Sequence, residues 1–197
     1  CEVGIFSAVA LFMTRYGTDI IAAHAAAINF SSLVYMIPLS ISITATIVIG
    51  FEIGAKRYRD ARHYTFLALA LSLFFAVIIG LNVFVFTDKV AALYSDSRPL
   101  QLLIISFLHY AIFFILVDAF GAPAQGVLRA YKDVRFATWT AILAYWGISI
   151  PLGMLLAEQG MGPYGFWLGL IIGLAVGALA LWQRIGKKTT TIMKEER

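Results

Sequence analysis

Long apolar stretches separated by short charged segments constrain the fold of this chain more than any other feature of its sequence. A lipid bilayer offers no water to unpaired backbone groups, so an apolar spanning segment of about 20 residues must be a helix. Turn and charge signals delimit six such stretches. They cover residues 1–16, 20–54, 64–86, 99–128, 136–157 and 163–185. We therefore predict an all-α integral membrane protein, built as a six-transmembrane-helix bundle.

The composition supports this prediction. The chain is 61% hydrophobic and only 13% charged, whereas ordinary globular domains carry about 25% charged residues. It has one cysteine, Cys1, and no cluster of His and Cys at the spacing of a zinc site, so we expect no bound cofactor. The chain opens inside an apolar helix without the basic segment of a signal peptide. We interpret it as part of a longer protein.

Most of the cations lie in three hydrophilic segments, which indicates an orientation. Residues 55–63, residues 129–135 and the segment from Arg184 onward hold twelve of the fifteen lysines and arginines. By the positive-inside rule these segments are cytoplasmic. We expect a multi-pass protein of the cell membrane with residues 186–197 as a cytoplasmic tail. Because the charges are spread over separate membrane-flanking loops, the pI of 9.3 does not indicate a nucleic-acid partner.

Four glycines recur at every fourth position of the last apolar stretch. They are Gly165, Gly169, Gly173 and Gly177. This spacing aligns them on one helix face, where a neighbouring helix can approach closely. A nucleotide-binding loop is excluded, because no strand precedes these glycines and no lysine of a phosphate-binding loop follows them.

Two acidic residues interrupt the apolar stretches. Asp118 lies eleven residues before Arg129, about 16 Å along a helix, which is near the middle of a bilayer core about 30 Å thick. Glu2 lies thirteen residues before Arg15, roughly 20 Å from its helix end. A charge at such depth costs at least about 2.5 to 3.5 kcal/mol, so these residues usually face a cavity and mark an ion or proton pathway.

Two carboxylates in one cavity have a chemistry of their own. Each raises the proton affinity of the other, and together they offer the oxygen ligands that a hard cation prefers. Asp118 and Glu2 could therefore exchange a proton for a Na⁺ ion that both of them bind. The structural alternative is a protonated carboxyl that hydrogen-bonds to a neighbouring helix.

Polar side chains also gather on the second stretch. Asn29, Ser32 and Met36 follow helical spacing and can share one face, with Tyr35 near its edge. We consider Asn29, Ser32 and Met36 as possible cavity-lining residues, although a hydroxyl in a membrane helix more often bonds to its own backbone. The phenol of Tyr35 can donate to a carboxylate or coordinate a cation.

Nothing in the sequence indicates enzymatic catalysis. The three histidines, His24, His63 and His109, lie in separate segments and form no arrangement of nucleophile, base and orienting group. We therefore expect the protein not to be an enzyme and the histidines to be structural or interfacial.

Several segments resemble one family of transporters. "INFSSLVYMIPLSIS" at residues 28–42 and "GFEIGAKRYRDAR" at residues 50–62 resemble the region from the seventh to the ninth helix of multidrug and toxic compound extrusion (MATE) transporters of the NorM-type branch. "VDAFGAPAQGVLRAYKD" at residues 117–133 resembles their tenth helix and the loop after it. "CEVGIFSAV" at residues 1–9 resembles their seventh helix with its acidic residue in place. The resemblance covers essentially the whole chain.

The resemblance implies a transporter of twelve helices in two six-helix lobes that rock to give alternating access. Residues 1–197 would be the C-terminal lobe, and the N-terminal lobe would be missing. Asp118 and Glu2 match acidic positions of the family's cation site, and Tyr35 falls in a helix that lines the same cavity. The implied function is antiport of Na⁺ or H⁺ against amphipathic, often cationic, organic compounds or drugs. A flippase of lipid-linked precursors from the same broader superfamily is the alternative, followed by a membrane-embedded enzyme.

Overall fold

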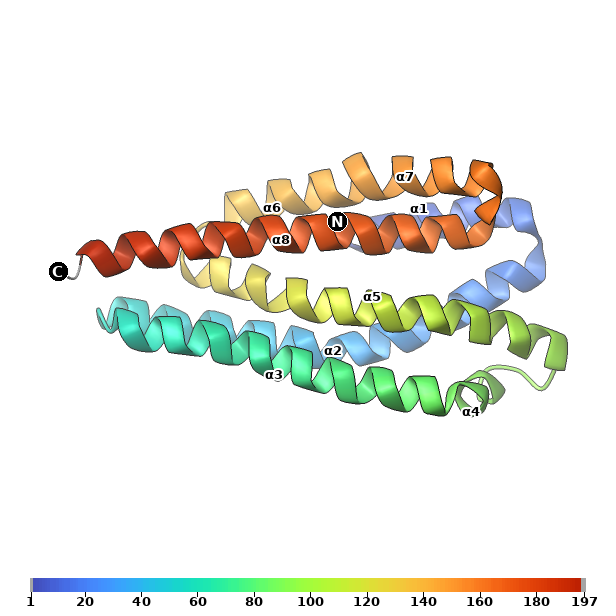
Figure 1. Ribbon diagram of the computed structural model, residues 1–197, viewed down its shortest axis with the longest axis horizontal. Helices are drawn as coiled ribbons and strands as arrows, with labels where there is room; N and C mark the ends of the chain where they lie inside the picture. Colours follow the sequence, from blue (N-terminus) through green and yellow to red (C-terminus); the bar gives the residue numbers. More distant parts are fainter. Residues whose placement is uncertain (1, 196–197) are drawn as a thin grey trace.

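The computed structural model describes residues 2–195, with the side chains of residues 4–191. Within residues 2–195 the chain is helical and has no strand, and the helices run side by side along one axis (Figure 1). In chain order the elements are α1 (Glu2–Met13), the 3₁₀ turn η1 (Thr14–Tyr16), α2 (Thr18–Gly54), α3 (Tyr58–Val85), α4 (Thr87–Ala92), α5 (Arg98–Ala130), α6 (Val134–Ile142), the π-helical η2 (Leu143–Ser149), α7 (Ile150–Leu156), the π-helical η3 (Ala157–Met161) and α8 (Pro163–Glu195).

Five helical segments are long and apolar enough to cross a membrane. Four of them are α2, α3, α5 and the first 29 residues of α8, and the fifth runs continuously from α6 through η3, residues 134–161. The apolar segment Gly4–Tyr16 is shorter than these five. The predicted all-α membrane fold is confirmed, with this shorter helix in the place of the first predicted stretch.

Two helix ends lie outside the boundaries predicted from hydropathy. Helix α3 begins at Tyr58 rather than near residue 64, and α8 continues to Glu195 through the segment predicted as a tail. The physical reason is that a change in hydropathy marks the edge of the bilayer, whereas a helix continues wherever its residues still favour it. The added turns carry Arg59, Arg62, Lys187 and Lys188, whose long side chains suit an exposed helical surface.

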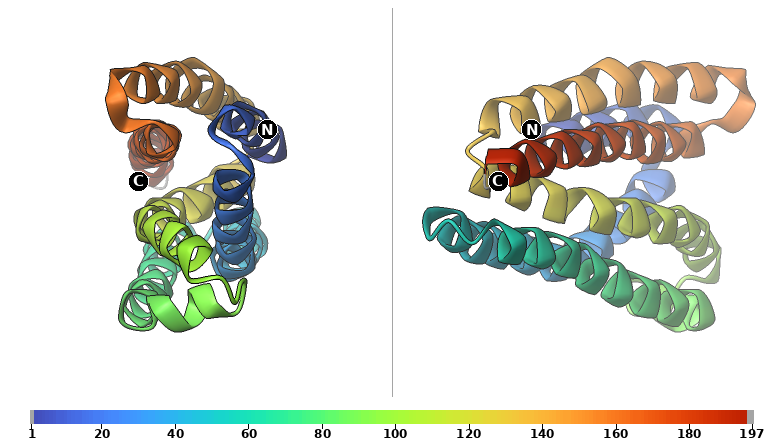
Figure 2. Two further views of the ribbon diagram at one scale, coloured as in Figure 1. Left: turned by 90° about the vertical axis from the view of Figure 1, so that its right-hand side faces the viewer. Right: turned by 60° about the vertical axis from the view of Figure 1, so that its left-hand side comes forward.

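Helix α5 is the central element of the bundle and packs against α2, α3 and α8 (Figure 2). The two helices α5 and α2 lie close together at Gly126, where a Cβ atom would lie 2.9 Å from the carbonyl carbon of Ser42. The Ser42 hydroxyl donates to the Ala122 carbonyl at 2.7 Å, and the Thr46 hydroxyl donates to the Gly126 carbonyl at 3.0 Å. Small residues and interhelical hydrogen bonds hold membrane helices together in this way.

The glycine face of α8 packs against the segment from α6 to η3. A Cβ atom on Gly165 would lie 2.5 Å from the backbone nitrogen of Ala157, and one on Gly173 would lie 2.6 Å from the Ala144 carbonyl oxygen. The prediction that these glycines admit a neighbouring helix is therefore confirmed. The Ser149 hydroxyl donates to the Ala144 carbonyl at 3.0 Å, and it thereby satisfies a backbone acceptor inside the π-helical segment η2.

The cation-rich segments meet at one end of the bundle, formed by the α2–α3 turn, the α5–α6 turn and the end of α8 (Figure 1). Asp133 in the α5–α6 turn accepts from Arg184 at 2.8 Å and lies 3.5 Å from Lys188 of α8. Partial burial raises the pKa of Asp133, but these two cations outweigh it and leave the pKa below its usual value of 3.8. The arrangement agrees with the single cytoplasmic face expected from the positive-inside rule.

Candidate functional site

Asp118 is buried in the middle of the central helix, with 6% of its surface exposed. It lies twelve residues before Ala130, the last residue of α5, which is about 18 Å along the axis and close to the bilayer midplane. The structure thus shows a buried acid in the middle of a long apolar helix, and its depth in the bilayer stays a prediction. An acid at such a depth needs nearby groups that stabilise its charge or take up its proton.

A small pocket surrounds the side chain of Asp118 and joins four elements of the fold. Its described lining residues come from α1, α2, α5 and η2, and they are Phe6, Ile28, Ser31, Ser32, Tyr35, Phe114, Asp118 and Tyr145. The cavity volume is about 40 Å³. One water needs roughly 10 to 15 Å³ on this measure, whereas drug-sized ligands occupy pockets of about 300 to 1,000 Å³. The pocket thus fits a small cation with one or two waters and excludes a drug.

Oxygen atoms dominate the polar lining of this pocket. Besides Asp118, it contains the hydroxyls of Ser31, Ser32, Tyr35 and Tyr145. Ser31 donates its proton to the Ala27 carbonyl and Ser32 to the Ile28 carbonyl, both at 2.8 Å. Their lone pairs stay available as acceptors, because each hydroxyl has used its only donor. A carboxylate with hydroxyl oxygens around it is a ligand set for a hard cation, or a place to hold a proton.

Glu2 was predicted as the second acid of the site. It is the first residue of α1, one helical turn before Phe6. Its side chain lies outside the part of the structure that is described. Among the described residues that line this pocket Asp118 is the only acid, so a cation site built from them depends on it.

The predicted residues of α2 divide between the pocket and the surface. Ser32 and Tyr35 line the pocket with Asp118. Asn29 is exposed and accepts a hydrogen bond from the Tyr94 hydroxyl at 3.0 Å, and Met36 is 55% exposed. Neither of these two is among the described lining residues. Asn29, Ser32 and Met36 do share the exposed face of α2, as their spacing predicted, but the pocket opens only at the edge of that face.

Sequence reasoning missed Phe6 and Tyr145. Phe6 follows Glu2 by four residues, so its place on the same helix face could have been read from the spacing. Tyr145 lies in η2, where a wider π-helical turn shifts side chains away from the positions that α-helical spacing predicts. Pro151 was the available signal, because a proline six residues later disturbs the regular hydrogen bonding of the preceding turn.

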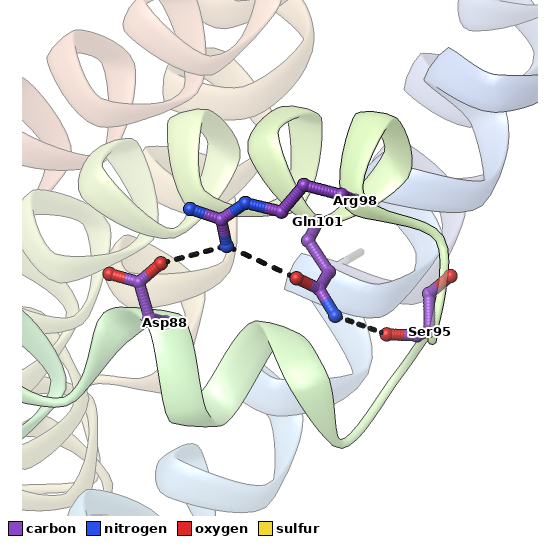
Figure 3. A network of polar contacts seen from close by, with 4 residues as sticks. All are labelled: Asp88, Ser95, Arg98 and Gln101. Atoms are coloured by element: carbon purple, nitrogen blue, oxygen red, sulfur yellow. Dashed lines mark hydrogen bonds and ion pairs between the residues drawn. The ribbon is translucent and has the colours of Figure 1, made fainter.

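Other polar contacts serve the fold. His24 accepts a hydrogen bond from the Trp167 indole at 3.2 Å inside the core, as expected for a structural histidine. At the other end of the bundle from the basic turns, Arg98 donates to Asp88 at 3.1 Å and to Gln101 at 3.2 Å (Figure 3). Gln101 in turn donates to the Ser95 carbonyl at 2.8 Å. This network holds the linker between α4 and α5 in place.

Comparisons with known proteins point to one group. The sequence model of the MatE family matches residues 1–155. A protein named "Probable multidrug resistance protein NorM" from Oceanobacillus iheyensis is 48% identical over 185 residues, which are 93% of this chain and 41% of that protein. A protein of the same name from Bacillus subtilis is 43% identical over 187 residues, 94% of this chain and 41% of its own length.

A solved structure shares the fold. It is described as the outward-facing conformation of a multidrug resistance MATE family transporter of the MOP superfamily, and it matches 98% of this chain and 43% of that chain. The TM-score is 0.84 and the sequence identity is 18%. This chain therefore spans less than half the length of the proteins it matches.

Proposed function

This chain belongs to the MatE family, and from that premise we propose that the complete protein is an antiporter that exports amphipathic, often cationic, organic compounds in exchange for Na⁺ or H⁺. The chain is a multi-pass membrane protein with the helices to form one lobe of such a transporter. The rest of the protein supplies the second lobe. The two lobes then rock against each other to expose a shared cavity to either side of the membrane.

The observation that carries the proposal is the ion-sized pocket around Asp118. A cavity of about 40 Å³ cannot enclose a drug-sized compound, which needs several hundred Å³. It can hold the coupling ion, with Asp118 as the charged ligand and the hydroxyls of Ser31, Ser32, Tyr35 and Tyr145 as neutral ones. The substrate then binds elsewhere, on the surface that the two lobes share. An acid in the pocket also favours exchange of cations over the flipping of an anionic lipid precursor.

Neutralisation of Asp118 supplies the energy difference that coupling requires. An uncompensated charge at this depth costs at least about 2.5 to 3.5 kcal/mol. At 1.4 kcal/mol per tenfold change, binding of a proton or Na⁺ can shift a two-state equilibrium by about a hundredfold. The loaded and empty forms therefore differ enough to favour opposite orientations of the lobes. Glu2, one turn before Phe6 on α1, is the second acid that we propose for the same site.

The exposed face of α2 is the part of this chain that we propose for substrate contact. Asn29, Ser32 and Met36 lie on it, and a face that mixes polar and apolar side chains suits an amphipathic compound. Ser32 belongs both to this face and to the ion pocket. A bound organic cation and the coupling ion would therefore compete near Ser32, as an exchange mechanism requires.

The proposal is tested with the complete protein reconstituted into vesicles. Efflux of ethidium is measured under an imposed Na⁺ gradient and then under an H⁺ gradient. We expect efflux with at least one of the two ions, abolished by Asp118→Asn. Asp88→Asn is the matched control, because Asp88 is an exposed acid in a surface ion pair. Efflux by Asp118→Asn at the wild-type rate, or no efflux with either gradient, would refute the proposal.

A further inference from the structure

A second cavity lies on the cytoplasmic side of the Asp118 pocket. It lies between α5, α6, η2 and α8, and Gln125, Thr140 and Tyr145 are its polar lining residues. Its volume is about 10 Å³, which is about the space that a single water requires. The rest of its wall consists of small or aliphatic residues, among them Gly121 and Gly177.

The two cavities share a wall. Tyr145 lines both of them and is buried, with 2% of its surface exposed. Gln125 follows Asp118 by seven residues, so it lies on the same face of α5, two turns or about 10.5 Å nearer the cytoplasmic end. Only five residues separate Gln125 from Ala130 at the end of the helix, which is about 7.5 Å. Asp118, Tyr145 and Gln125 therefore lie in sequence along one route.

A water in the second cavity could supply hydrogen bonds that its polar side chains do not form with the protein. Gln125 and Thr140 are half-buried inside membrane-spanning segments. Within the described part of the chain, no side chain or backbone group forms a hydrogen bond with either side chain. An amide and a hydroxyl in a bilayer need such partners. A water in the adjoining cavity can supply them, and so can a passing cation bound by the two oxygens.

The environment of Asp118 differs in the two directions along α5. Toward the outer end lies Phe114, which packs edge to face against Phe6 with ring centroids 5.8 Å apart. Toward the cytoplasmic end lie Tyr145 and then Gln125. Aromatic rings exclude water and ions from one direction, whereas hydroxyl and amide groups accept them from the other.

We propose that Tyr145, Gln125 and Thr140 form a hydrated path through which the coupling cation leaves Asp118 for the cytoplasmic side. This inference rests on the proposed function, because it assigns the exit route of the ion that drives transport. Tyr145 lies between the two cavities. For Na⁺ to pass, the ring of Tyr145 must move, whereas a proton can be relayed through its hydroxyl. Gln125 and Thr140 are positioning residues that hold the water or the Na⁺ beyond it.

Solvent access tests the path without any measurement of transport. In the complete protein, freed of other cysteines, Gln125→Cys is compared with Leu128→Cys for reaction with a small cationic methanethiosulfonate added to inside-out vesicles. Leu128 is nearer the cytoplasmic end but fully buried. We expect Gln125→Cys to react about tenfold faster, because thiol reactivity follows exposure. Equal rates for the two variants would overturn the path.

A second comparison tests whether the path sets the rate at which the cation leaves or the affinity with which the protein binds it. Thr140→Val removes a hydroxyl from the path, whereas Thr138→Val removes an exposed hydroxyl of the same helix that only bonds to the Val134 carbonyl. We expect Thr140→Val to slow cation-driven efflux several-fold while the affinity for the cation stays unchanged, and Thr138→Val to behave as wild type. If the wild type shows no cation-driven efflux, the proposed function fails. If the wild type shows cation-driven efflux and Thr140→Val has the same efflux rate as Thr138→Val, the proposed path is refuted and the proposed function stands.

Discussion

Replacement of Gly173 by alanine is a sharp test of the packing described for α8. The added Cβ atom would lie 2.6 Å from the Ala144 carbonyl oxygen and would also collide with the Ser149 hydroxyl. Overpacking of this kind costs about 1 to 3 kcal/mol. Loss of the hydrogen bond from Ser149 to Ala144 adds about 1 kcal/mol. The better helix propensity of alanine returns about 1 kcal/mol, so we expect Gly173→Ala to lower the free energy of unfolding by about 1 to 3 kcal/mol.

Gly186→Ala is the matched control in the same helix. Nothing lies within 4 Å of the position that its Cβ atom would take, so we expect a gain of about 0.5 to 1 kcal/mol from helix propensity alone. Both variants of the complete protein are unfolded reversibly in mixed detergent micelles, with tryptophan fluorescence as the readout. If Gly173→Ala is as stable as Gly186→Ala, the close approach of α8 to η2 does not exist as described.

Two further predictions concern contacts that hold the helices together. Ser42→Ala removes the hydrogen bond that Ser42 donates to the Ala122 carbonyl at 2.7 Å and the one that it accepts from Arg129 at 3.0 Å. It should lower stability in the same micelle assay by about 1 to 3 kcal/mol; no loss would mean that neither bond contributes to stability. The pKa of Asp133 is below 3.8 in the folded protein. Its ion pair with Arg184 therefore stabilises the fold above pH 3.8, and this stabilisation is lost as the pH falls through the pKa of Asp133 in the folded protein. Hydrogen exchange in the α5–α6 turn should rise over that acid range, and Asp133→Asn should remove the pH dependence.

The sequence predicted those features that depend on burial and helical spacing alone. The position of Asp118 inside a long apolar helix followed from the apolar stretch around it, and the close packing of Gly173 followed from a repeat of four residues. Spacing also grouped Asn29, Ser32 and Met36 on one face of α2. These predictions succeeded because a bilayer leaves the backbone little choice but a regular helix.

The features that the sequence did not predict depend on departures from a regular α-helix. Tyr145 reaches the pocket from a π-helical segment, which changes the angle between successive side chains. The pocket itself lies at the edge of the α2 face, at Ser32 and Tyr35, and this position depends on how α1, α2, α5 and η2 pack together. Periodicity within one helix carries no information on that packing.

The central claim is that Asp118 binds the coupling ion, and direct measurement of cation binding tests it without a substrate. Binding of radioactive Na⁺ and release of protons are measured on the purified complete protein, on Asp118→Asn and on Asp88→Asn. The account predicts that the wild type and Asp88→Asn either bind Na⁺ or release protons when an organic cation or Na⁺ is added. It predicts that Asp118→Asn neither binds Na⁺ nor releases protons. Wild-type binding by Asp118→Asn would contradict it.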